Sequence, residues 1–141
     1  MSTDVLQLTA QPLTSEAFAA FGEVIDSRTS EHFMINSGRT RRHHDLAKVE
    51  VAGESPRVLI SIFVSQPVTV PLELTFLERH PLGSQAFVPM HEEQFLIVVA
   101  PPGDVIDPAE VRAFITDGRQ GVNYRIGTWH AIQSVLEREG E

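Results

Sequence analysis

The stretch 72–80, LELTFLERH, constrains the fold of this chain more than any other part of the sequence. Its side chains alternate with a period of two, as they do along a β-strand. One face of that strand carries Leu72, Leu74, Phe76, Glu78 and His80. Because ionisable side chains are costly to bury without partners, a face that changes from apolar to ionisable has left a packed core and entered a site. The sequence therefore predicts a strand that ends at a functional site.

The segments around this strand are short and are separated by turn residues. The sequence Pro-Leu-Gly-Ser at 81–84 predicts a turn. One helical pattern is expected at 14–21, capped by Thr14 or Ser15, with Phe18 and Phe21 facing the core. Short strands with a single N-terminal helix indicate an all-β fold, an antiparallel β-barrel or a sandwich. Further strands are expected at 57–66, from 85 onward, and at 95–100 and 132–136. The segment 111–116 is ambiguous between helix and strand, and strand is favoured.

The segment 57–66 has apolar side chains on both faces of its predicted strand. Val58, Ile60, Ile62 and Val64 share one face, whereas Leu59 and Phe63 lie on the other. Two apolar faces need cover from a second sheet or a partner subunit. The sequence therefore predicts a homodimer.

Composition bounds the class of protein and its partners. With 141 residues, one domain spanning 1–141 is expected. The absence of cysteine excludes disulfides and thiolate metal sites and is compatible with the expected cytoplasmic location. The sequence shows neither a signal-peptide pattern nor an apolar run long enough for a membrane span. A net charge of -8 argues against nucleic acid or an anionic membrane as a partner, but it permits a small anionic substrate held by a local arginine.

Two spacings predict a cluster of metal-binding side chains. Glu78-x-His80-x4-Gln85 is similar to the first cupin motif, HxHxxxxE, with Glu and Gln replacing its first and last ligands, and the segment 127–130, GTWH, resembles the GxxH core of the second. In a small antiparallel barrel these positions point inward to one place. Glu78, His80, Gln85 and His130 are therefore candidate ligands of a divalent metal ion, and no organic cofactor is expected. The alternative is that both histidines are ordinary strand-end residues.

The dense basic cluster of this acidic chain lies at 39–45, RTRRHHD. It is either a solvated loop or a lid that presents guanidinium groups to a substrate carboxylate. In the second case Arg41 and Arg42 bind the carboxylate, and His44 beside Asp45 supplies an oriented imidazole.

Beyond these spacings, the segment 78–90, ERHPLGSQAFVPM, resembles the signature of the bacterial ureidoglycolate lyase family. Similar stretches follow the family order at 35–38, 44–47, 112–116, 120–124 and 129–130, so that the resemblance covers about 8–130. It implies a cupin-like barrel, usually a homodimer, that releases urea and glyoxylate from ureidoglycolate in allantoin degradation. The sequence departs from the family at Ala131, where a second histidine usually follows Trp-His, and at Glu141, beyond which family chains continue, so a truncated C-terminal end is expected.

The resemblance gives the candidate residues their roles. Glu78, His80 and His130 are the candidate catalytic residues, either as metal ligands or with Glu78 as the general base. Substrate binding is expected from Asn36, Arg41, Arg42, His44, Gln85 and Asn123. A rival function is that of a non-catalytic cupin that holds a small organic acid as a sensor or carrier. A metal-dependent dioxygenase or isomerase is less favoured, because such cupins usually use two or three histidine ligands.

Overall fold

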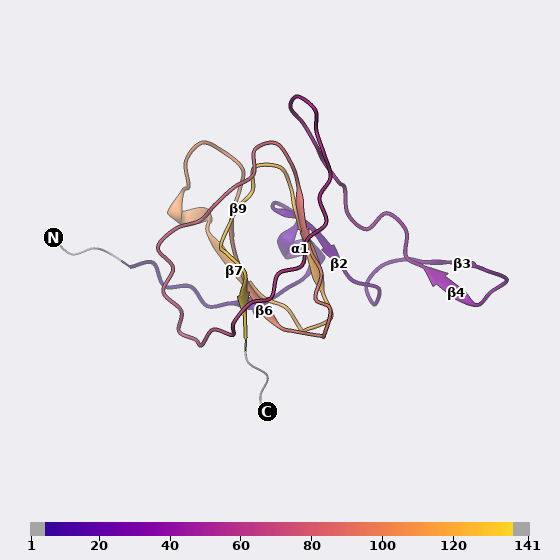
Figure 1. The fold of residues 1–141 in the computed structure, drawn as a ribbon. Helices are drawn as coiled ribbons and strands as arrows, with labels where there is room; N and C mark the ends of the chain where they lie inside the picture. Colours follow the sequence, from indigo (N-terminus) through magenta and orange to yellow (C-terminus); the bar gives the residue numbers. More distant parts are fainter. Residues whose placement is uncertain (1–4, 137–141) are drawn as a thin grey trace.

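The computed structural model describes residues 5–136, which form two β-sheets, a separate hairpin and short helices (Figure 1). The first sheet has the order β1 (Gln11–Pro12), β7 (Arg112–Ile115), β6 (Phe95–Ala100) and β10 (Ser134–Val135), with β9 (Trp129–His130) also paired to β6. The second has the order β2 (Gly22–Ile25), β8 (Gly121–Tyr124) and β5 (Gln85–Phe87). The hairpin consists of β3 (Phe33–Ile35) and β4 (Thr40–Arg42).

The all-β prediction is confirmed by this architecture. All strand pairs within these sheets are antiparallel except the pair of β1 with β7, which is parallel. The helices of the described residues are α1 (Ser15–Phe18) and the 3-10 turn η1 (Pro108–Glu110). Neither has the length or apolar character to cross a bilayer. The expected truncated end concerns residues after 136, which lie outside the described residues.

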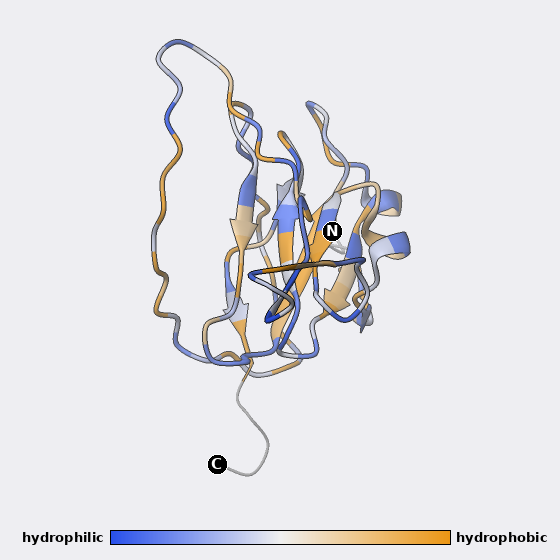
Figure 2. Ribbon diagram, turned by 90° about the vertical axis from the view of Figure 1, so that its right-hand side faces the viewer, coloured by the Kyte–Doolittle hydropathy of each residue, from blue (hydrophilic) through white to orange (hydrophobic). Residues whose placement is uncertain are grey.

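One hydrophobic core joins the two sheets and α1. Its buried members include Ile97 and Phe114 from the first sheet, Val122 and Tyr124 from the second, and Phe18 from the helix. Figure 2 shows the apolar strands in the middle of the molecule and the helix at its edge. Because β6 is apolar at successive positions and is paired on both sides, it is the central strand of the first sheet.

The helix is shorter than the predicted segment 14–21, but its cap and its packing are confirmed. The Thr14 hydroxyl accepts a hydrogen bond from the Ala17 backbone N–H at 3.2 Å, as an N-cap does. Phe18 and Phe21 are both buried, with ring centroids 5.7 Å apart. The chain leaves the helix early because Gly22 already belongs to β2, where a Cβ atom would lie 1.8 Å from the backbone oxygen of Asn123.

Two predicted strands are wrong for the single chain. Residues 57–66 pair with no strand among the described residues, and their apolar side chains are exposed, Ile60 by 97% and Val64 by 90%. Within 72–80, Glu78 alone forms a bridge, which is antiparallel to His130. Alternating apolar residues permit a strand, but a strand also needs a neighbouring backbone to pair with, and the described part of the chain supplies none here.

Candidate active site

Glu78, His80 and His130 meet at one end of the first sheet. Each offers a ligand atom, and these atoms all lie within 4.8 Å of one another. The backbone sets this geometry, because Glu78 and His130 exchange two hydrogen bonds, N to O at 2.9 and 2.8 Å, that tie the segment before the turn to β9. The Gly127 N–H donates to the His80 carbonyl at 3.0 Å, which holds the two motif segments side by side. The two imidazole centroids are 5.3 Å apart.

The protonation state of His130 is set by its surroundings. Its Nδ1 lies 3.0 Å from the carbonyl oxygen of Thr128, and since a carbonyl only accepts, Nδ1 carries the hydrogen. Burial lowers the pKa of His130 below its usual 6.5, opposed by the Thr128 carbonyl, while the charge of His80 lowers it further and that of Glu78 raises it. The ring is therefore neutral near pH 7, and its Nε2 presents a lone pair.

That lone pair faces a carboxylate. His130 Nε2 is 3.6 Å from Glu78 Oε1, and it has no hydrogen-bond partner within the described residues although it is buried. With His130 neutral, the nitrogen and the carboxylate oxygen are both acceptors, so neither satisfies the other. An arrangement of this kind calls for a proton, a donor group of a substrate or a cation between the two atoms.

The aromatic ring of Tyr124 forms the inner wall of the site. It stacks on the His130 imidazole with centroids 4.5 Å apart and planes 9° from parallel. Burial raises the pKa of the Tyr124 hydroxyl, so the ring stays neutral. Gln85 lies opposite Tyr124 in the β5–β8 ladder, and its Oε1 is a second buried acceptor without a partner among the described residues.

The outward side of the segment holds Arg79. Its guanidinium stacks over the Trp129 ring at 4.7 Å and donates to the Gly103 carbonyl, with Asp104 at 3.7 Å. These contacts hold Arg79, the arginine nearest in sequence to the site residues, outside the site.

The predicted substrate-binding residues do not all gather at this site. Asn123 is buried in β8, where its amide nitrogen donates to Glu23 and to the Lys48 carbonyl. Asn36 has a positive φ of 52° in the turn of the hairpin, where its amide donates to Thr40. Both amide groups are therefore engaged in contacts within the protein.

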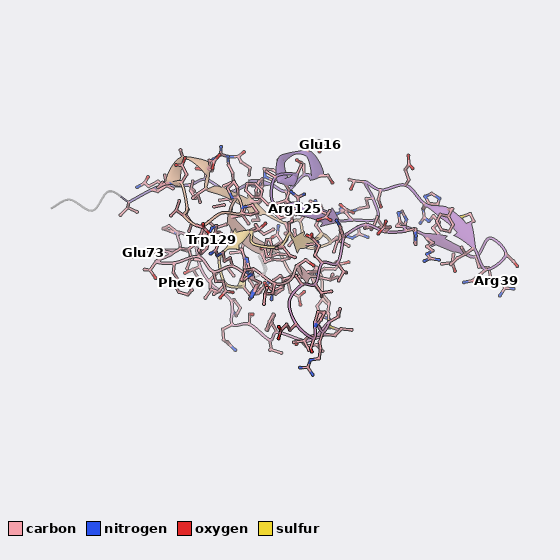
Figure 3. The ribbon with its side chains drawn as sticks, turned by 90° about the horizontal axis from the view of Figure 1, so that it is seen from above. Glu16, Arg39, Glu73, Phe76, Arg125 and Trp129 are labelled. Atoms are coloured by element: carbon pink, nitrogen blue, oxygen red, sulfur yellow. The ribbon has the colours of Figure 1, made fainter. Side chains whose placement is uncertain are left out.

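The basic residues lie on the β3–β4 hairpin, which projects from the body of the molecule. Figure 3 shows Arg39, at its tip, and Trp129, beside the site, in separate parts of the molecule. Arg41 and Arg42 are exposed on β4, and the His44 ring contacts Phe33 at 5.9 Å. A substrate contact by these residues stays a prediction, and the single chain does not bring them to Glu78, His80 and His130.

Two elements of the site were missed by reasoning on the sequence. Tyr124 is the single tyrosine of the chain and shares strand parity with Val122, which is the signal that could have placed it inward. The Thr128 carbonyl fixes the His130 tautomer, but a backbone atom leaves no mark in the sequence.

The donor set fits a divalent metal ion. One carboxylate and two imidazoles are ligands for zinc and other divalent transition metals, and the orphaned Nε2 of His130 is aimed at the common point. The Nδ1–H bond to Thr128 is the kind of outer contact that orients a ligating histidine. The predicted convergence of Glu78, His80 and His130 is thus observed as a geometry suited to a metal.

Comparison of the sequence with known proteins shows the family of this chain. The family model described as ureidoglycolate lyase matches residues 5–141. The chain is 55% identical over 123 residues to a protein of Azotobacter vinelandii named ureidoglycolate lyase, covering 87% of this chain and 74% of that one. It is 53% identical over 134 residues to the protein of that name from Stutzerimonas stutzeri, covering 95% and 79%. A Burkholderia mallei protein of the same name is 54% identical over 123 residues, covering 87% and 72%. The chain therefore belongs to the ureidoglycolate lyase family.

Proposed function

We propose that this protein is a ureidoglycolate lyase that releases urea and glyoxylate from ureidoglycolate, a step of allantoin degradation, and that Glu78, His80 and His130 form its reaction centre. The observation that carries the proposal is the unpartnered lone pair of His130 Nε2, buried and opposite the Glu78 carboxylate. The expected non-catalytic alternative, a binder of small organic acids, needs donors only. A neutral base held in one tautomer is suited to moving a proton.

The reaction needs one proton moved from oxygen to nitrogen. Ureidoglycolate is a carbinolamide: as the 2-hydroxyl loses its proton, the C–O bond becomes the aldehyde of glyoxylate, the C–N bond breaks, and the urea nitrogen takes up a proton. His130 Nε2 accepts the hydroxyl proton and then returns it to the leaving nitrogen. The imidazolium formed in between faces Glu78 Oε1 at 3.6 Å, which stabilises it.

Glu78 acts in this proposal as the charge partner of His130 and not as the base. Its side chain is 46% exposed, whereas that of His130 is 3% exposed. The buried imidazole with its free lone pair is therefore the group assigned to accept the proton.

A divalent metal ion is part of the proposal in a limited sense. Glu78, His80 and His130 would hold it, with Gln85 as a further oxygen donor. Such an ion would polarise the substrate hydroxyl and lower its pKa. Such an ion would take the Nε2 lone pair of His130, so metal binding and the base role of His130 exclude each other, and the chelator test below separates them.

The test is a urea-release assay on ureidoglycolate, with and without a chelator. Urea and glyoxylate in equal amounts are the expected products, and loss of the activity is expected for His130→Gln, with retention of the fold checked by circular dichroism. If a chelator abolishes urea release and an added divalent ion restores it, the His130 lone pair is a metal ligand. If the chelator leaves urea release unchanged, the lone pair is the proton acceptor. Absence of urea release by the wild-type protein would overturn the lyase proposal.

Three further expectations accompany this function. The substrate is a small anion, the protein acts as a homodimer, and it works in the cytoplasm without nucleic acid or membrane as a partner. The exposed apolar run at 57–66 supports the homodimer. A monomeric mass by light scattering at micromolar concentration would contradict it.

A further inference from the structure

The hairpin of β3 and β4, residues 33–42, is called the arm here. It projects away from the two sheets (Figure 1). Its strands pack substantially on each other and on no sheet of the described residues. An isolated two-stranded hairpin is marginally stable in water, so an arm of this kind needs a surface to lie on.

The arm combines apolar area with positive charge. Phe33 and Met34 are about half exposed, at 49% and 51%. Arg42 stacks over the Phe33 ring at 5.8 Å, and Arg41, opposite Met34 in the ladder, has no ion-pair partner among residues 5–136. In a chain of net charge -8, such an arm is attracted to an acidic surface that also offers apolar area.

The proposed reaction centre, in contrast, needs a positive charge for its substrate. Its substrate carries a carboxylate, yet the arginines nearest in sequence to the site residues are engaged elsewhere. Arg79 is held by Trp129 and the Gly103 carbonyl, and Arg125 donates to the Ala19 carbonyl at 3.3 Å. The described charges that act on His130 are His80 and Glu78. Without a metal ion at the site, a carboxylate bound beside Glu78 therefore needs a cation from another source.

A second copy of this chain is the partner that meets both needs. It carries the same acidic body, the same incomplete site and the same uncovered apolar run at 57–66, in which Ile60 and Val64 are the most exposed. Two copies related by a two-fold axis exchange equivalent contacts, so each arm finds a surface and each site gains a cation.

We propose that the arm of one copy completes the active site of a second copy, where Arg41, assisted by Arg42, binds the substrate carboxylate in trans. This inference rests on the proposed lyase function. It adds that the anion-binding residues and the proton-transferring residues of one working site come from different chains.

The first test pairs two differently defective chains in one dimer. One carries His80→Ala and has an intact arm, and the other carries Arg41→Gln with Arg42→Gln and has an intact reaction centre. The two chains are co-expressed with different affinity tags and purified over both tags in sequence. Each parental dimer is expected to be inactive, whereas the mixed dimer is expected to show about half the wild-type rate, because one of its two sites receives both intact parts.

The outcomes of this test are distinct. If the arm serves its own chain, every site in the mixed dimer lacks one part and the mixed dimer stays as inactive as its parents, which overturns the inference. An active wild-type protein that is monomeric by light scattering overturns it as well. An inactive wild-type protein refutes the lyase proposal, and the second test then decides on the arm.

The second test needs no turnover. Since the chain has no cysteine, single thiols can be introduced at Arg41→Cys on the arm and at Leu82→Cys, in the turn between His80 and Gln85. A short bismaleimide is expected to join the two differently tagged variants into a species of twice the chain mass. Arg41→Cys mixed with Glu16→Cys, on the exposed surface of α1, is the matched control and should remain uncoupled. Coupling no greater than in this control would overturn the inference.

Discussion

Replacing Glu78 by Gln tests the electrostatics on which the proposed chemistry depends. Glu78 Oε1 lies 3.6 Å from His130 Nε2 and raises the pKa of that imidazole, against the lowering by burial. Two unit charges at this distance interact by about 1 kcal/mol in the water-like dielectric suited to a half-exposed carboxylate. Removing this interaction in Glu78→Gln should therefore lower the His130 pKa further.

The measurement is an NMR titration of the histidine rings in chelator-treated protein. It reads the His130 pKa directly and does not depend on turnover. The wild-type value should lie below 6.5, and the Glu78→Gln value lower still. Glu73→Gln is the matched control, because that exposed carboxylate is not among the charges acting on His130, and it should leave the titration unchanged.

The depressed pKa of His130 also makes the stability of the protein depend on pH. Because the folded pKa of His130 is depressed, the unfolded chain binds more protons as the pH falls from about 6.5, so His130 reduces stability progressively in that direction. Glu78→Gln should enlarge this loss, which thermal unfolding at a series of pH values will measure. An unchanged or raised His130 pKa in Glu78→Gln would refute the reasoning, since the two groups would then not face each other.

The remaining predictions concern single positions. His80→Ala should abolish urea release while leaving the melting temperature unchanged, because the side chain is exposed, and His91→Ala, at another exposed histidine, should keep full activity. Gly22→Ala should destabilise the protein by about 3 kcal/mol or more in urea unfolding, because its Cβ would clash with a backbone oxygen of β8. Thr14→Ala should cost about 1 kcal/mol in the same assay through loss of the α1 cap, and an unchanged midpoint would show that the cap is dispensable.

The sequence determined the features that depend on local pattern. The apolar run at 95–100 became β6, and the pattern at 111–116 became β7, because runs of apolar and β-branched residues fit a buried ladder. The cap at Thr14 was readable because its hydroxyl bonds to a residue three positions along the same chain. The convergence of His80 with His130 was predicted from motif spacing. The two motifs are typical of a fold that brings these distant segments together.

Tertiary structure decided everything that depends on a partner distant in sequence. Asn123 looked available to a substrate, but Glu23 and the Lys48 carbonyl take its amide hydrogens. Residues 57–66 alternate as a strand does, yet they remain unpaired because no neighbouring backbone reaches them within the described chain. The reactive form of His130 is set by the Thr128 carbonyl and by burial against Tyr124. Residue types fix what each group can donate or accept, whereas the partner it finds, and hence its pKa and tautomer, is fixed only when the chain has folded.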